Sequence, residues 1–72
     1  MRNSEVAKAW SMGESAESGN MSTDGNRIYS YAMLIGEVVN GKRTVYRRSR
    51  SVTTSRHINL AARWADEIIN KY

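Results

Sequence analysis

The sequence predicts a small α+β domain with a short N-terminal helix, a two- or three-stranded antiparallel sheet, and a C-terminal amphipathic helix packed on one sheet face. At 72 residues and 40% hydrophobic composition, the chain has room for one domain, residues 1–72. Two β-rich runs flank Asn40-Gly41, a dipeptide typical of tight hairpins. The chain has no cysteine, so packing or a partner must stabilise it.

The N-terminal third predicts one helix followed by irregular chain. Residues 3–12 are expected to form a short helix, because Val6 and Trp10 are four residues apart and share one side. Residues 13–26 are rich in Gly, Ser, Asn and Glu, which predicts a flexible loop. In an alternative reading, the Asp24-Gly25 pair closes a turn and a short strand lies at the end of this loop.

Residues 27–52 are expected to form a β-hairpin around a type I′ turn at Asn40-Gly41. The turn fixes the register: Val39 faces Lys42, and the pairing continues until Tyr29 faces Val52. One face then carries the small or aliphatic residues Ala32, Leu34, Gly36, Val38 and Val45. The other face carries Tyr29, Tyr31, Met33, Ile35 and Tyr46.

Two interpretations of these faces stay open. A helix covering the small-residue face would leave the tyrosines as an exposed platform for stacking. Alternatively, the tyrosine face is the core and the arginine stems beside it extend outward to solvent.

Residues 54–71 are expected to form a helix, because apolar residues recur at helical spacing. The stripe consists of Ile58, Ala61, Ala62, Ala65, Ile68, Ile69 and Tyr72. Trp64 lies to one side of it. We expect Trp64 to pack against Trp10 or Val6, since large aromatic side chains are mostly buried; the alternative is an exposed anchor for a partner.

Charge gives the main indication of function. The net charge is +4, but it is unevenly distributed. Residues 1–26 carry two basic and four acidic side chains, whereas residues 27–72 carry nine basic and three acidic side chains. Within 42–56 there are six cations and no carboxylate: Lys42, Arg43, Arg47, Arg48, Arg50 and Arg56. Such a run favours nucleic-acid binding, because the arginine fork suits phosphate. The alternative is a strand edge kept soluble by its charge.

Two further groups of side chains are candidates for contact with a ligand. The candidate stacking residues or partner anchors are Tyr29, Tyr31, Tyr46 and Trp64. The start of the last helix is a candidate phosphate site, formed by Thr54, Ser55, Arg56 and His57. Ordinary helix capping explains the same hydroxyl groups and is the favoured reading.

Catalysis, metal binding and cofactor binding are not expected. His57 is the only histidine and the glycines lack phosphate-loop spacing. No apolar run approaches the length of a membrane span, so we expect no membrane contact and a cytoplasmic protein.

Three resemblances bear on function. The order of helix, strands and helix resembles the double-stranded-RNA-binding domain in outline. A basic strand at 46–52 that leads through Thr53-Thr54 to Ala62-Arg63-Trp64 is similar to the arm-type DNA-binding domains of phage integrases, which implies contacts by Arg47, Arg48 and Arg50. Short phage-encoded proteins of unsettled function resemble the whole chain, through Ser22-Thr23-Asp24-Gly25, Tyr29-Ser30-Tyr31, Leu34-Ile35-Gly36, Thr53-Thr54-Ser55 with His57, and Asn59-Leu60-Ala61.

Together these observations predict a non-enzymatic, phage-type accessory protein that binds nucleic acid through an Arg-rich hairpin. One alternative is a phage-type inhibitor that binds the acidic patch of a host protein such as a CRISPR or restriction nuclease, acting in the host cytoplasm. Another is a structural homodimer that pairs through Leu60 and Trp64 or through an open sheet edge.

Overall fold

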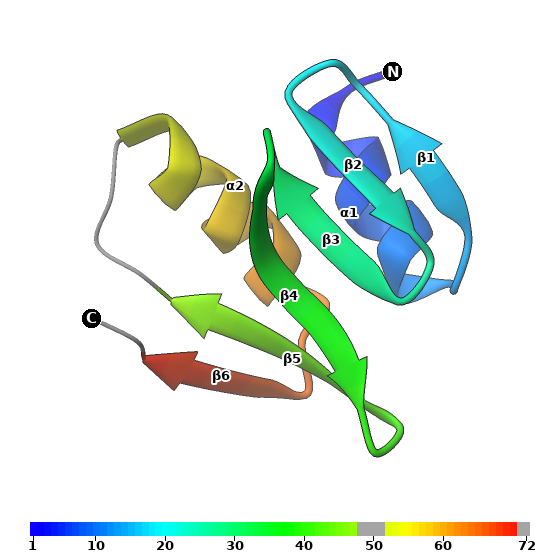
Figure 1. The fold of residues 1–72 in the computed structure, drawn as a ribbon, viewed down its shortest axis with the longest axis vertical. Coiled ribbons are helices and arrows are strands. Elements are labelled where there is room, and N and C mark those ends of the chain that lie inside the picture. The colour runs from blue at the N-terminus through cyan, green and yellow to red at the C-terminus, as the bar shows by residue number, and fades with distance from the viewer. Residues whose placement is uncertain (48–51, 71–72) are drawn as a thin grey trace.

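Two helices cover one face of a six-stranded sheet in the computed structural model, which describes residues 1–47 and 52–70 (Figure 1). In chain order the elements are α1 (Asn3–Ser11), β1 (Ser15–Glu17), β2 (Met21–Asp24), β3 (Arg27–Ser30), β4 (Met33–Val39), β5 (Lys42–Arg47), α2 (Val52–Ala62) and β6 (Glu67–Asn70). The strands lie in the sheet in chain order; β1 to β5 pair antiparallel and β6 pairs parallel to β5. The chain is α+β, but the expected antiparallel sheet of two or three strands is wrong.

The segment 13–26 forms β1 and β2 rather than a flexible loop. Its turns are held by polar side chains instead of apolar periodicity. Asp24 Oδ1 accepts the backbone N–H groups of Asn26 (2.9 Å) and Arg27 (2.8 Å), which is the local bonding that makes Asp a turn residue. These bonds hold the pKa of Asp24 below its ordinary value. The alternative of a short strand at the end of this segment is confirmed by β2.

The β4–β5 turn has the predicted geometry. Asn40 and Gly41 both have positive φ, 52° and 78°, as a type I′ turn requires. The register runs as expected from Val39 opposite Lys42 to Gly36 opposite Val45.

The expected hairpin over 27–52 is nevertheless wrong, because its first arm is two strands. The chain reverses after Ser30, where Tyr31 adopts φ 56°, so Tyr29 pairs with Leu34 in β4 instead of with Val52. A register shift beside this pair places Ile35 in the core, as β-bulges commonly redirect a side chain.

The last helix ends at Ala62, so the expected helix over 54–71 is also wrong. Asp66 provides the physical reason. Its backbone N–H donates to the Arg43 carbonyl oxygen (2.7 Å), and its carboxylate accepts the Arg43 backbone N–H (2.9 Å). This pair of bonds starts β6 alongside β5, where β-branched Ile68 and Ile69 suit a strand. Both isoleucines are exposed rather than part of a core stripe.

The core lies between the helices and one sheet face, here called the helix side. It consists of Val6, Ala7, Trp10, Met21, Ile28, Ile35, Val45, Ile58 and Ala61. Gly36 lies beneath Trp10, and a Cβ at that position would be 3.0 Å from Ile28 Cγ2 and 3.4 Å from the Trp10 ring. The helices thus cover the face with Gly36 and Val45, while Tyr29 and Tyr46 alternate onto the opposite, outer sheet face.

A buried polar chain joins both helices to the sheet. The Asn3 amide nitrogen lies 3.1 Å from His57 Nε2, and His57 Nδ1 lies 2.6 Å from Ser30 Oγ. Because an amide nitrogen can only donate, Nε2 accepts and Nδ1 carries the ring proton. The Asn3 amide oxygen in turn accepts from the Ser18 hydroxyl. His57 is 2% exposed, so it links α1, α2 and β3 as a neutral ring.

Burial makes this link sensitive to acid, because it lowers the pKa of His57 from its ordinary value of 6.5. The unfolded chain therefore binds a proton on His57 more readily than the folded chain does. The free energy of unfolding is highest above about pH 6.5 and falls as the pH drops below that value.

We expect urea unfolding to show this loss of stability between pH 7 and pH 5. The variant His57→Gln should lack the pH dependence and should lower the free energy of unfolding at pH 7 by about 1 kcal/mol. An equal pH slope in both proteins would contradict this assignment; Asp24 titrates at lower pH and does not interfere.

Candidate nucleic-acid interface

The described members of the basic run have different environments. Arg43 is half-buried and its Nε donates to the Trp10 carbonyl oxygen (3.0 Å), so it satisfies the end of α1. Lys42 is exposed beside the β4–β5 turn. Arg47 and Arg56 are exposed on β5 and α2. Arg48 and Arg50 lie outside the described residues, and the predictions on them stay predictions.

Arg47 and Arg56 are available to a ligand. Arg47 borders a depression of about 180 Å³ with Ser55, Ile58 and Asn59 of α2, so its side chain lies on the helix side. Within residues 1–47 and 52–70, neither guanidinium group makes a hydrogen bond or an ion pair. An exposed guanidinium group without an internal partner can bind a phosphate without first breaking a hydrogen bond or ion pair within the protein.

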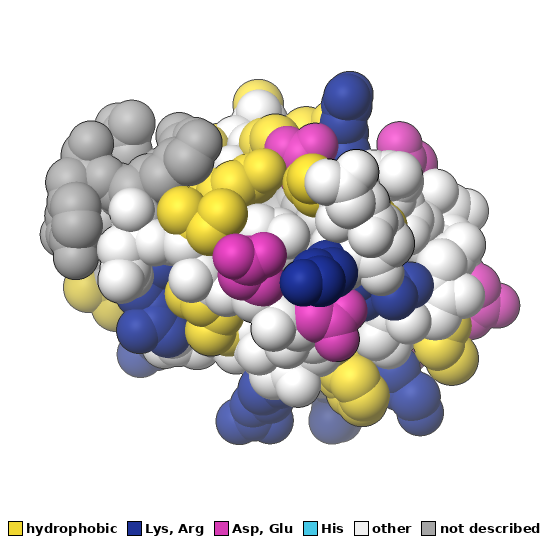
Figure 2. All heavy atoms as spheres, turned by 90° about the horizontal axis from the view of Figure 1, so that it is seen from below, with side chains coloured by type: hydrophobic (Ala, Val, Ile, Leu, Met, Phe, Trp, Pro, Cys, Tyr) yellow, Lys and Arg dark blue, Asp and Glu magenta, His cyan; other side chains and the backbone are white. Residues whose placement is uncertain are grey.

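The two faces of the molecule differ in charge. The helix side carries the exposed cations Arg2, Lys8, Arg47, Arg56 and Arg63. Its exposed carboxylates include Glu5 and Glu14, which line one hollow with Lys8. On the outer sheet face, alternation along the strands places Glu17, Asp24, Glu37 and Glu67 with Arg27 and Lys42. Figure 2 shows several Lys and Arg side chains protruding along its lower edge, whereas Lys and Arg side chains are mixed with Asp and Glu side chains across the middle and top. The helix side is therefore the face that attracts polyanions.

The four candidate aromatic residues divide between these faces. Tyr29 and Tyr46 are half-buried on the acidic outer face, and the Tyr46 hydroxyl donates to Glu37 Oε2 (2.9 Å). Tyr31 is 59% exposed at the β3–β4 turn, with its ring centroid 5.9 Å from that of His57 in α2. A stacking platform on the outer face would place phosphates beside carboxylates, which disfavours it.

Trp64 does not pack as expected against Trp10 or Val6. Trp10 is fully buried and its indole N–H donates to the Asn26 carbonyl oxygen (2.8 Å), whereas Trp64 is 43% exposed. Trp64 follows the end of α2 in a turn, where its N–H donates to the Ala61 carbonyl oxygen (3.0 Å). Trp64 has the exposure that the anchor alternative requires, and its role as a partner anchor stays a prediction.

The candidate phosphate site at the start of α2 is only partly accessible. Ser55 and Arg56 are exposed, but Thr54 and His57 are buried, and His57 is committed to Asn3 and Ser30. Thr54 lies inside the helix that begins at Val52 and is not free. Arg56 is thus the cation of this cluster that faces solvent.

A groove between the two helices was not anticipated from the sequence. The α1–α2 groove has a volume of about 220 Å³ and is lined by Ser4, Glu5, Lys8, Leu60, Arg63 and Trp64. The sequence indicated that Leu60 and Trp64 flank the core stripe, but which residues of α1 lie opposite them depends on how the helices pack. The groove combines two cations, an exposed indole and one carboxylate.

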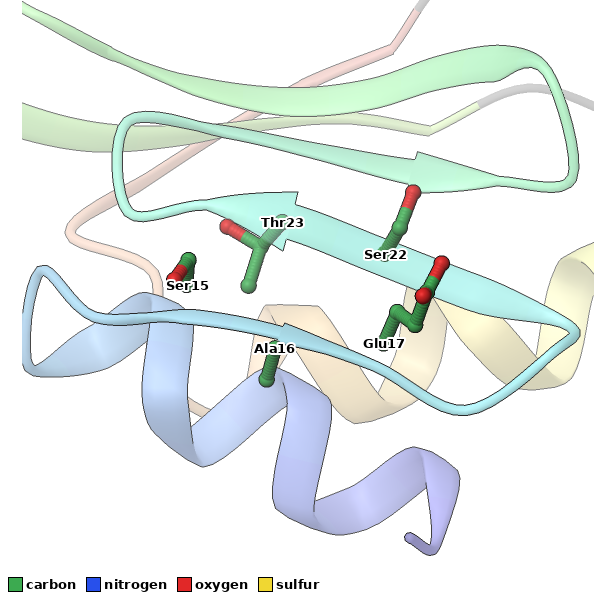
Figure 3. Close-up of a pocket in the computed structure, with 5 residues that line it drawn as sticks. All are labelled: Ser15, Ala16, Glu17, Ser22 and Thr23. Carbon is green, nitrogen blue, oxygen red and sulfur yellow. The ribbon is translucent and has the colours of Figure 1, made fainter.

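A second hollow, of about 310 Å³, lies over β1 and β2 and has a different character (Figure 3). Glu17 and Ser22 project on one side of these strands, whereas Ala16 points to the other side, toward α1. Its charged lining residue is Glu17, so this hollow does not suit a phosphate.

Other chemistry has little structural basis in the part of the chain that the structure describes. No group of three or more His, Asp or Glu side chains there is placed to hold a metal ion. Ser30 is 1% exposed, and its hydroxyl faces His57 Nδ1. Because Nδ1 carries the ring proton, it cannot act as a base toward the Ser30 hydroxyl. Among the described residues, no helix has the length and apolar character needed to cross a bilayer.

No family model, curated protein or solved structure matches this chain. The resemblances to phage-encoded proteins, double-stranded-RNA-binding domains and integrase arm-type domains stay predictions. Function is therefore inferred from the residues and their placement.

The contrast between the two tryptophans is directly measurable. Trp10 is fully buried and Trp64 is 43% exposed, so acrylamide or iodide should quench the emission of Trp64 and leave that of Trp10 largely unaffected. We expect Trp64→Phe to remove the quenchable component without changing the circular dichroism spectrum. Residual strong quenching in that variant would show that Trp10 is accessible and that the core differs from the one described.

Proposed function

We propose that this chain is a non-enzymatic nucleic-acid-binding module whose contact surface is the helix side, around Arg47 and Arg56. The observation that carries the proposal is the absence of any internal partner for these two exposed arginines within residues 1–47 and 52–70, on the face where basic side chains outnumber acidic ones. Arg48 and Arg50 belong to the same run in the sequence and are included as contacts on that ground.

The physical mechanism is neutralisation of phosphates. Each arginine that replaces a condensed counterion on the nucleic acid releases that ion, so affinity depends steeply on salt. Arginine forks bind phosphate oxygens in a bidentate manner and fix the orientation of the module, without reading sequence. Carboxylates on the outer sheet face repel the same polyanion, so the charge distribution orients the encounter.

Removing these arginines should weaken binding in proportion to the lost phosphate contacts. We expect Arg47→Gln and Arg56→Gln each to lower affinity and to reduce the slope of log K against log salt concentration by about 1. Fluorescence anisotropy with labelled single- and double-stranded DNA and RNA, at two salt concentrations, measures both quantities.

Arg27→Gln is the matched control, because Arg27 is also exposed but lies on the outer sheet face. It should leave the affinity and the salt slope nearly unchanged. An equal loss in the control would show that net charge rather than the helix side is responsible. Absence of binding to every nucleic acid at low salt would refute the proposal, and a stoichiometric protein partner that survives nuclease treatment would point to the host-protein inhibitor instead.

A second candidate, the homodimer, is favoured by the exposed edge of β6. All four residues of β6 are exposed, and Ile68 and Ile69 are 43% and 37% exposed. Natural edge strands usually carry charges or bulges that prevent pairing, whereas β6 combines two β-branched residues with one carboxylate. Antiparallel pairing of β6 with its copy would join two sheets across a two-fold axis.

Charging this edge should prevent such pairing. We expect Ile69→Lys to be monomeric at concentrations where the unmodified chain sediments as a dimer, because a lysine on a strand edge disfavours strand addition. Val39→Lys is the control, since Val39 is similarly exposed at 39% but lies in the interior strand β4. A monomeric unmodified chain at all concentrations would exclude the homodimer.

A further inference from the structure

We propose that the α1–α2 groove is a binding site for an unpaired nucleotide, with the base stacked on Trp64 and the adjacent phosphate held between Lys8 and Arg63. The inference deepens the proposed function, on which it rests, by assigning the class of ligand: single-stranded or locally unpaired nucleic acid.

The position of Trp64 supports a stacking role. The core already contains Trp10 and is closed by Ile58 and Ala61 of α2, and Trp64 remains 43% exposed at the groove. An indole half in water at the rim of a hollow offers a flat apolar face to a planar ligand. Stacking of a base on such a ring is sequence-tolerant, because every base has a π-face.

The charges of the groove select an anion. Lys8 comes from α1 and Arg63 follows α2, so packing of the two helices brings cations from distant parts of the sequence to one hollow. Neither cation makes a hydrogen bond or an ion pair among residues 1–47 and 52–70. Glu5 is the carboxylate of the groove, and it lowers the attraction for an anion without cancelling it.

The combination of the Trp64 ring with two cations favours unpaired nucleotides over a regular duplex. A regular duplex presents phosphates and groove edges while its base faces are stacked internally, so it can meet Lys8 and Arg63 but cannot use Trp64. An unpaired nucleotide can use all three side chains. The groove therefore adds affinity for single strands to the phosphate contacts made by Arg47 and Arg56.

Tryptophan fluorescence and anisotropy test this assignment with an oligothymidylate and a duplex of equal length as probes. We expect the oligothymidylate to quench Trp64 emission, and Trp64→Leu to lower its affinity about 10-fold while leaving duplex affinity unchanged. Trp64→Phe should retain most of the affinity, because phenylalanine also stacks, and it shows whether loss in the leucine variant comes from the aromatic face or from altered folding.

The Glu5 carboxylate provides a second test, in which removing a charge is expected to raise the affinity instead of lowering it. Glu5→Gln should tighten binding of the oligothymidylate, whereas Lys8→Gln and Arg63→Gln should weaken it. Arg27→Gln, on the outer sheet face, is the control for total charge.

The outcomes separate this inference from the proposed function. If the oligothymidylate binds without quenching Trp64 and with equal affinity for Trp64→Leu, the groove assignment is overturned while the helix-side proposal stands. If no nucleic acid binds at low salt, both fail. If polyglutamate quenches Trp64 and competes as well as the oligothymidylate, the groove recognises acidic protein segments and the nucleotide assignment is overturned.

Discussion

Packing of Trp10 over Gly36 places α1 on one face of the sheet, and Ile58 and Ala61 of α2 join the same core. A Cβ at position 36 would be 3.0 Å from both Ile28 Cγ2 and the Thr44 carbonyl oxygen and 3.4 Å from the Trp10 ring, so the site is closely packed. With this contact in place, the remaining apolar side chains of α1 and α2 bury against the same face. The opposite face is left without a helical cover (Figure 1), and the molecule has two chemically different sides.

This one-sided packing turns a modest net charge into a directional field. A charge of +4 spread evenly would attract polyanions weakly from every side. Among residues 1–47 and 52–70, the helix side carries most of the exposed cations and the outer sheet face most of the carboxylates, so approach is favoured from one direction. The same packing forms the groove that contains Trp64 and gives the proposed contacts one continuous side of the fold.

Local sequence signals predicted the parts of this fold that depend on a few neighbouring residues. Asn40-Gly41 predicted both the turn and four residue pairs of the β4–β5 register. The strand β6 was missed because Ile68 and Ile69 fit a helical stripe as well as a strand, and the bonds of Asp66 to Arg43 that decide between them join distant residues. Arg43 was predicted to contact a ligand because its actual partner, the Trp10 carbonyl oxygen of α1, is also distant in the sequence.

Mapping the nucleic-acid contact by NMR tests the central claim most directly. Titrating a short single-stranded oligonucleotide into isotopically labelled protein should shift the amide resonances of α1, α2 and the end of β5, together with the indole resonance of Trp64. The resonances of β2 and β3 should move little, apart from those of residues that contact α2. Shifts concentrated on Glu17, Tyr29 and Glu37 would place the contact on the outer sheet face and contradict the account.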